Sequence, residues 1–124
     1  MGNAAEKQRH IDVLAPFCPA YSHAMEIIGR RWTGAIIRSM ITGATRYSEI
    51  VAAVPGLSDR LLSERLKELE AEGIVERKVT PSTPVRVDYE LTEKGRALGA
   101  VVREVARWAD RWGDPPVAAA PACD

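Results

Sequence analysis

A segment of strictly alternating residues constrains the fold most, because it indicates a strand within a largely helical sequence. Over residues 85–91 the order VRVDYEL alternates apolar and charged side chains, the period of two that a half-buried strand shows. Residues 74–79 indicate a preceding strand, and the intervening segment 81–84 begins and ends with proline, as turns often do. The chain is therefore expected to contain a two-stranded hairpin.

Helical patterns surround this hairpin. Apolar residues recur at helical spacing over residues 19–28, over 32–41 with Trp32 on the stripe, and over 47–53. The turn Pro55-Gly56 precedes a helix over 58–72, and a last helix is expected over 93–112. Helix, helix, short helix, turn, helix, hairpin, helix is the order of a winged helix-turn-helix. The expected fold class is thus α+β, mostly α with a two-stranded β wing.

Length and composition fit one small domain. The 124 residues support a single hydrophobic core, which we expect over residues 18–113, between an N-terminal arm (1–17) and a disordered Pro/Ala-rich tail (114–124). No run approaches the roughly 20 apolar residues of a membrane span. The polar start of the chain lacks the apolar core of a secretion signal. These features predict a cytoplasmic protein without a membrane partner.

Charge is balanced overall but unevenly distributed. Seventeen basic residues offset seventeen acidic ones, yet residues 30–67 hold seven cations against three acids, and residues 68–92 hold six acids against three cations. One face of such a domain can be basic while the whole is neutral. This distribution is compatible with a nucleic-acid partner.

The helix over 58–72 is the expected reading element. Its leucines at 62, 66 and 69 share the inward face, and an α-helix fits the DNA major groove. Beyond the cap Ser58, the residues expected to face base edges are Arg60, Ser63, Glu64 and Lys67. The residues expected to contact phosphates are Arg31, Arg46, Arg65, Lys78 and Arg86. Arg65 has an alternative, because it flanks the leucine stripe and would also pair with Glu64 or Glu68.

The last helix has the pattern of a dimer interface. Its large apolar residues are spaced three, four, three and four, as in a coiled-coil seam. Tyr21 of the first helix is assigned to the same interface, and packing within one chain remains the alternative for the two tryptophans. The seam consists of Leu98, Val101, Val105, Trp108 and Trp112.

Enzymatic and metal-binding functions fit poorly. The sequence shows no Ser/His/Asp set, no paired-carboxylate cleft and no glycine-rich phosphate loop. With two histidines and two distant cysteines, neither a metal site nor a cofactor is expected. Trp32 is interpreted as a core residue, with a place in a ligand pocket as the alternative.

The sequence resembles the HxlR-type transcriptional regulators, relatives of the MarR group, from Cys18 to about Gly113. The resemblance implies a homodimer that binds an inverted-repeat operator in double-stranded DNA. Arg30 departs from the family, which usually has a small residue there. The matching motifs are Cys18-Pro19, Ile28-Gly29-Arg30-Arg31-Trp32, Arg46-Tyr47-Ser48-Glu49-Ile50, Pro55-Gly56-Leu57-Ser58, Leu62-Ser63-Glu64-Arg65-Leu66-Lys67-Glu68-Leu69-Glu70, Gly73-Ile74-Val75 and Tyr89-Glu90-Leu91-Thr92-Glu93-Lys94-Gly95.

Cys18 is a candidate thiol sensor. It precedes Pro19 at the expected start of a helix, where the positive end of the dipole stabilises a thiolate. Several relatives are thought to sense quinones, aldehydes or oxidants through a cysteine at the matching place, which implies a small-molecule or oxidant effector. The alternative is a buried, unreactive cysteine. Oxidation would link Cys18 to the other subunit or to Cys123.

The alternative function is a winged-helix domain that binds proteins or small molecules without reading DNA. Binding to the DNA upstream of the protein's own gene separates the two hypotheses.

Overall fold

The computed structural model describes residues 16–113. The expected arm over 1–17, apart from its last two residues, and the expected tail over 114–124 lie outside the described part. The elements are α2 (Pro19–Ile28), α3 (Thr33–Ile41), α4 (Tyr47–Ala53), α5 (Asp59–Ala71), β1 (Val75–Thr80), β2 (Arg86–Leu91) and α6 (Glu93–Trp112). This order confirms the winged helix-turn-helix expected from the sequence. No helix between residues 16 and 113 is long and apolar enough to span a bilayer.

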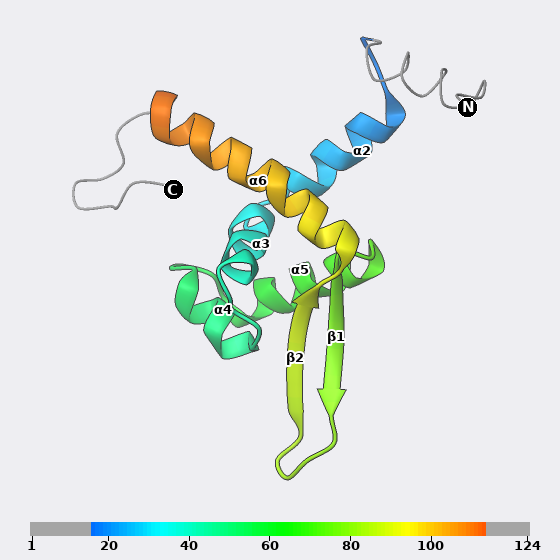
Figure 1. Cartoon of the computed structure of the whole chain (residues 1–124), viewed down its shortest axis with the longest axis vertical. Helices are drawn as coiled ribbons and strands as arrows, with labels where there is room; N and C mark the ends of the chain where they lie inside the picture. The colour runs from blue at the N-terminus through cyan, green and yellow to red at the C-terminus, as the bar shows by residue number, and fades with distance from the viewer. Residues whose placement is uncertain (1–15, 114–124) are drawn as a thin grey trace.

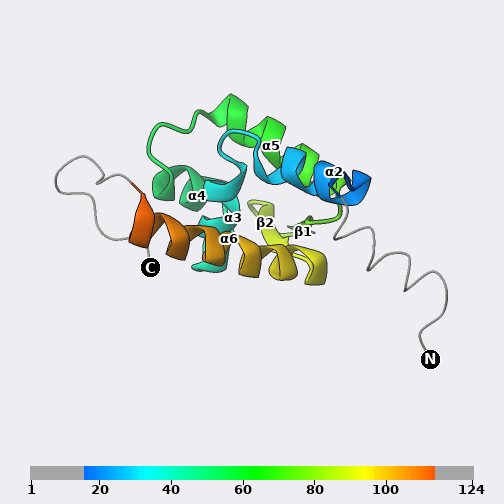
Figure 2. The ribbon, with the colours of Figure 1, turned by 90° about the horizontal axis from the view of Figure 1, so that it is seen from above.

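The elements form layers around one aliphatic core. Figure 2 shows α5 and α6 on opposite sides of the molecule, with α3 and the hairpin between them. The predicted leucines of α5 are buried and pack with Ile36 and Ile37 of α3, both fully buried. Ser58 caps α5 as expected, accepting a hydrogen bond from the Leu61 N–H at 3.1 Å, which satisfies one free donor of the first turn.

Trp32 lies at the boundary of α3 rather than within it, so its expected place on the helix is wrong. Its φ of 77° is a left-handed backbone conformation that few residues other than glycine adopt. Its carbonyl still accepts the first helical hydrogen bond, from the Ile36 N–H at 2.9 Å. The half-buried ring packs against the core, as the first interpretation had it, while its buried Nε1 has no partner within the described residues.

The hairpin, here called the wing, extends beyond the core (Figure 1). Its antiparallel register pairs Val75 with Leu91 at the base and Thr80 with Arg86 near the loop. The base is covered, since Val75 is buried and Leu91 is half-buried. Near the loop, Val85 is 61% exposed. The alternation in the sequence therefore predicted the strand correctly, but only its basal half packs on the domain.

The first turn of α6 lies directly against the base of the wing. A Cβ on Gly95 would overlap the carbonyl oxygen of Ile74, and one on Gly99 would come within 2.8 Å of Ile41 Cδ1. Thr92 caps the helix by accepting from the Gly95 N–H at 3.1 Å, and its own N–H donates to the Ile74 carbonyl at 3.0 Å. Glycine at these two positions permits α6 to pack closely.

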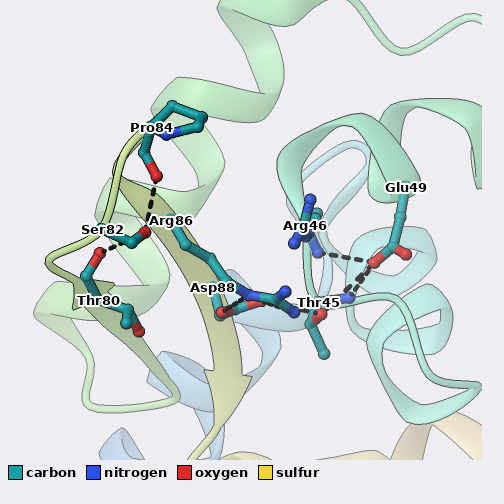
Figure 3. Close-up of polar contacts among 8 residues, drawn as sticks. All are labelled: Thr45, Arg46, Glu49, Thr80, Ser82, Pro84, Arg86 and Asp88. Atoms are coloured by element: carbon teal, nitrogen blue, oxygen red, sulfur yellow. Dashed lines mark hydrogen bonds and ion pairs between the residues drawn. The ribbon is translucent and has the colours of Figure 1, made fainter.

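A polar network joins the wing to α4 (Figure 3). The Tyr89 N–H donates to the Thr45 carbonyl at 2.7 Å, and Thr45 Oγ1 donates to Asp88 Oδ1 at 3.2 Å. Asp88 also accepts from Arg86 Nε at 2.8 Å. Glu49 accepts from the backbone N–H groups of Thr45 and Arg46 at 3.0 and 2.9 Å. These bonds fix the direction of the wing.

Both carboxylates of this network are stabilised in their charged form. The hydrogen bond from Arg86 lowers the pKa of Asp88, and the backbone N–H groups of Thr45 and Arg46 lower the pKa of Glu49. A lowered folded-state pKa contributes stability that is complete above the ordinary pKa near 4 and is lost as the pH falls through the folded-state value.

We therefore expect Asp88→Asn to be less stable than the parent protein at pH 6, and this difference to disappear as the pH falls below about 4. Urea unfolding at a fixed protein concentration, repeated between pH 6 and pH 3, measures it. Glu70→Gln is the control, because Glu70 is an exposed carboxylate of α5 that lies outside this network. An Asp88→Asn deficit that stays constant over this range would contradict the assignment.

Candidate nucleic-acid interface

The outer face of α5 presents the side chains that the sequence assigned to base reading. Arg60, Glu64 and Lys67 are exposed, and Ser63 is half-buried. The Arg60 side chain is 89% exposed, with its Nε 3.3 Å from Glu64 Oε1, a surface pair at i, i+4 that contributes little stability. Arg60 is thus free to exchange this partner. The face has the dimensions and the donors that a major groove accepts.

Tyr47 holds α4 against the start of α5. Its hydroxyl donates to the Asp59 carbonyl, so the two helices of the helix-turn-helix are joined beside Ser58. Burial raises the pKa of Tyr47, and the nearby Asp59 charge raises it further, which keeps the hydroxyl protonated as a donor. Tyr47 is not among the predicted site residues, because its place on the apolar stripe of α4 conceals its polar role in the sequence.

Arg46 and Arg86 lie on the two sides of a groove between α4 and the wing (Figure 3). The groove has a volume of about 360 Å³ and is otherwise lined by the loop residues 82–85 and Val87. Ser82 Oγ donates to the Pro84 carbonyl at 2.7 Å, which orders this loop. The structure thereby brings together two of the expected phosphate contacts from segments forty residues apart.

Two of the wing's three cations, Lys78 and Arg86, are paired with acids on the same hairpin. Lys78 Nζ lies 3.1 Å from Glu90 Oε1, and Arg86 Nε lies 2.8 Å from Asp88 Oδ2. These contacts raise the pKa of both basic groups, chiefly through the hydrogen bonds to Glu90 and Asp88. The wing is therefore less basic than its three cations, Arg77 included, suggest.

Arg65, a predicted phosphate contact, is half-buried and bonded within the chain. Only 14% of its side chain is exposed, with Nη1 3.2 Å from Glu68 Oε1, and its Nε donates to the Arg31 carbonyl at 2.9 Å. The alternative of pairing with Glu68 is thus the one observed. The Arg65 guanidinium thus joins α5 to the connection between α2 and α3. The side chain of Arg31 itself is exposed, with its Cζ 5.0 Å from the centre of the Trp32 ring.

Acids from the second charge block pair with cations from the first. Glu68 also accepts Arg30, whose Nη1 lies 3.1 Å from Oε2, and His23 Nε2 lies 3.1 Å from Glu72 Oε1. The uneven charge along the sequence is therefore cancelled in part between α5 and the connection that follows α2. The Arg30 substitution adds an intramolecular ion pair here.

The helices α2 and α6 share an exposed apolar face, here called the terminal-helix face. Tyr21 is 65% exposed, and Trp108 and Trp112 are each 64% exposed. A groove of about 310 Å³ lies between α2 and α6. Residues of both helices line it, Leu98 and Val101 among them. Packing of the tryptophans within one chain, the alternative considered above, is not observed. The exposed members are Tyr21, Met25, Val101, Val105, Trp108 and Trp112.

Cys18 lies beside this face, as the N-cap residue of α2. It is 9% exposed, at the limit of burial, and its carbonyl accepts the Ser22 N–H at 2.9 Å. Its expected partner Cys123 lies outside the described residues. Within residues 16–113, no group of three His, Cys, Asp or Glu side chains has the arrangement of a metal site.

Comparison with known proteins places this architecture in a family. The model of the HxlR-like helix-turn-helix family matches residues 27–116. Two transcriptional regulators of the HTH type from Bacillus subtilis, YvaP and YodB, are 51% and 49% identical over 98 residues, which are 79% of this chain and 91% and 88% of theirs.

Solved structures of transcriptional regulators have the same fold as this chain. The reduced form of B. subtilis YodB superposes with a TM-score of 0.70 at 48% identity, covering 81% of this chain and 98% of that one. The oxidised form of the redox regulator HypR gives 0.72 at 37% identity, covering 79% and all of the respective chains. This chain belongs to the HxlR-like helix-turn-helix family of transcriptional regulators.

Proposed function

We propose that the protein binds an inverted-repeat operator as a homodimer, with the outer face of α5 in the major groove and the wing beside the neighbouring backbone. The observation that supports this most directly is the exposed polar face of α5, held outward by its buried leucines. Arg60 and Lys67 carry donors that match guanine O6 and N7. Arg31, Arg46, Lys78 and Arg86 are then the phosphate contacts. The proposed activity is DNA binding rather than catalysis. The proposed location is the cytoplasm, where the DNA is accessible.

The terminal-helix face is the proposed dimer interface. Burying a large apolar side chain that is otherwise in water stabilises by about 1.5–3 kcal/mol, and six such side chains are exposed together on α2 and α6. Because α5 and α6 lie on opposite sides of the domain (Figure 2), pairing through α6 leaves both reading helices free. Two of them about 34–36 Å apart would reach successive major grooves.

The proposed signal is modification of Cys18. Structures of YodB exist in reduced, diamide-treated and quinone-bound forms, and this chain is 45–48% identical to them. Cys18 starts α2 beside the terminal-helix face, while the other end of α2 is tied to α5 through the Arg30–Glu68 pair. A bond at Cys18 that moves α2 would change the separation of the two α5 helices.

Trp108→Glu is expected to weaken dimerisation strongly, because it places a charge in the apolar interface. Sedimentation at micromolar concentration measures the change. Ala100→Glu is the matched control, since it adds the same charge at an exposed position of α6 outside the apolar seam and should leave the dimer intact. A parent protein that sediments as a monomer, or a Trp108→Glu variant that remains dimeric, would show that the interface lies elsewhere.

Arg60→Ala is expected to cost about 1–3 kcal/mol on the operator and almost nothing on random DNA, whereas Arg46→Ala should weaken both alike. Titration of the DNA upstream of the protein's own gene against a random duplex measures both. Arg107→Ala, on the α6 side of the domain, is the control. Equal losses on both DNAs for Arg60→Ala would contradict base reading, and a parent protein that binds neither would favour the alternative of a winged domain without DNA readout.

Treatment with diamide or a benzoquinone is expected to lower the operator affinity of the parent protein and to leave Cys18→Ser unchanged. Cys123→Ser is the matched control: it should respond to the quinone like the parent, because a quinone modifies a single thiol. Binding titrations before and after treatment provide the measurement. If treatment left the operator affinity of the parent protein unchanged, Cys18 would be a packing residue and not a sensor.

A further inference from the structure

A cavity separate from the interface and from Cys18 lies where α3, β2 and α6 meet. Its volume is about 440 Å³, within the range of small-molecule sites. The apolar part of its lining comes from Met40, Ile41 and Ala44 at the end of α3 and from Tyr89 and Leu91 of β2. Such a surface accepts the body of an aromatic or branched aliphatic molecule.

The polar part of the lining is predominantly positive. Arg96 and Arg103 contribute from α6. Arg96 uses one nitrogen, Nη1, to donate to the Leu91 carbonyl at 2.8 Å. The guanidinium of Arg103 has no hydrogen bond or ion pair with the residues that the structure describes. Glu90 is the acid of the lining, and its Oε1 is already 3.1 Å from Lys78 Nζ. The cavity therefore has two guanidinium groups whose charge is not matched locally.

An adjoining cavity extends the same pattern. It has a volume of about 310 Å³ and shares Ile41 and Arg103 with the first. Arg38 and Arg107 also line it, and Arg107 is paired with Glu104. Arg38 has no side-chain partner among residues 16–113. Arg103 thus lines both cavities, and the second cavity contains a further unpaired guanidinium, that of Arg38.

Dimerisation through the terminal-helix face leaves this site open. An α-helix turns by about 100° for each residue, so Val101 and Val105, each two residues from Arg103, project about 200° away from it. Arg96, seven residues before Arg103, lies on the same side as Arg103. The cavity and the apolar seam therefore occupy opposite flanks of α6.

We propose that the cavity between α3, β2 and α6 binds a small organic anion, a carboxylate with an apolar body of one or two rings. The apolar body lies on Met40, Ile41 and Leu91, and the carboxylate is held by Arg103 and Arg96. Guanidinium groups favour this ligand because they bind carboxylates through two parallel hydrogen bonds.

The position of the cavity would allow a bound ligand to regulate the protein. Its walls are the helix that carries the apolar seam, the basal half of the wing, and the helix that packs on α5. An anion bound there would bias the angle between α6 and the wing without touching DNA or Cys18. This regulatory effect rests on the proposed function, whereas binding of the anion does not.

Calorimetric titration of the full-length protein, without DNA, tests the proposal with 2-naphthoate and its neutral isostere 2-naphthamide. We expect naphthoate to bind and the amide to bind at least tenfold more weakly. Arg103→Gln should weaken naphthoate binding by about tenfold, the effect of losing one charge-assisted hydrogen bond, and should leave amide binding unchanged. Arg111→Gln, an exposed arginine of α6 that lines neither cavity, should bind like the parent.

Amide chemical shifts locate the ligand independently of affinity. Ligand-induced changes in the amide chemical shifts of Ala44, Tyr89 and Gly99 support the proposal. Changes confined to Val101 and Val105 would place the ligand on the terminal-helix face and overturn it. Equal affinity for acid and amide, no binding at millimolar naphthoate, or an unaffected Arg103→Gln variant would also overturn it. None of these outcomes depends on whether the protein binds DNA.

Discussion

The backbone around Ile74 is the junction on which the rest of the structure depends. Its N–H donates to the Leu69 carbonyl at 2.9 Å, which ends α5, and its carbonyl accepts the Thr92 N–H at the start of α6. The same carbonyl lies so close to Gly95 that no side chain fits there. One buried residue therefore connects α5, the wing and α6. Their relative directions are set together.

Most of the fold could be predicted from the sequence, because its elements are short and locally specified. The bounds of α4 and α6 follow from apolar spacing and from caps such as Thr92, which act within one turn. Trp32 was misplaced because helical spacing does not reveal a left-handed φ at the residue before the helix. The exposure of Val85 was missed since alternation indicates a strand but not how far the core extends beneath it.

The candidate site was predictable only in part, for a related reason. The outward face of α5 follows from the buried leucines of the same helix, so it needs no tertiary information. The role of Arg65 depends on Glu68 and on a carbonyl thirty-four residues earlier, and that of Asp88 on Thr45. The pair with Glu68 is local and was one of the alternatives read from the sequence. The contacts with the Arg31 carbonyl and with Thr45 join distant segments, and a single sequence contains no signal for them. In the structure both side chains hold neighbouring segments together.

The pairing of the surface cations has a consequence for the thermodynamics of association. Protein–DNA affinity draws much of its strength from counterions released when free cations neutralise phosphates. Lys78 and Arg86, two of the proposed phosphate contacts, already have carboxylate partners at 3.1 and 2.8 Å, so each would have to exchange one anion for another, and the displaced acid would stay near the duplex. The entropic gain is smaller than the number of basic residues implies. Under the proposed function, such a surface would bind unrelated DNA weakly and would depend on base contacts for its affinity to the operator.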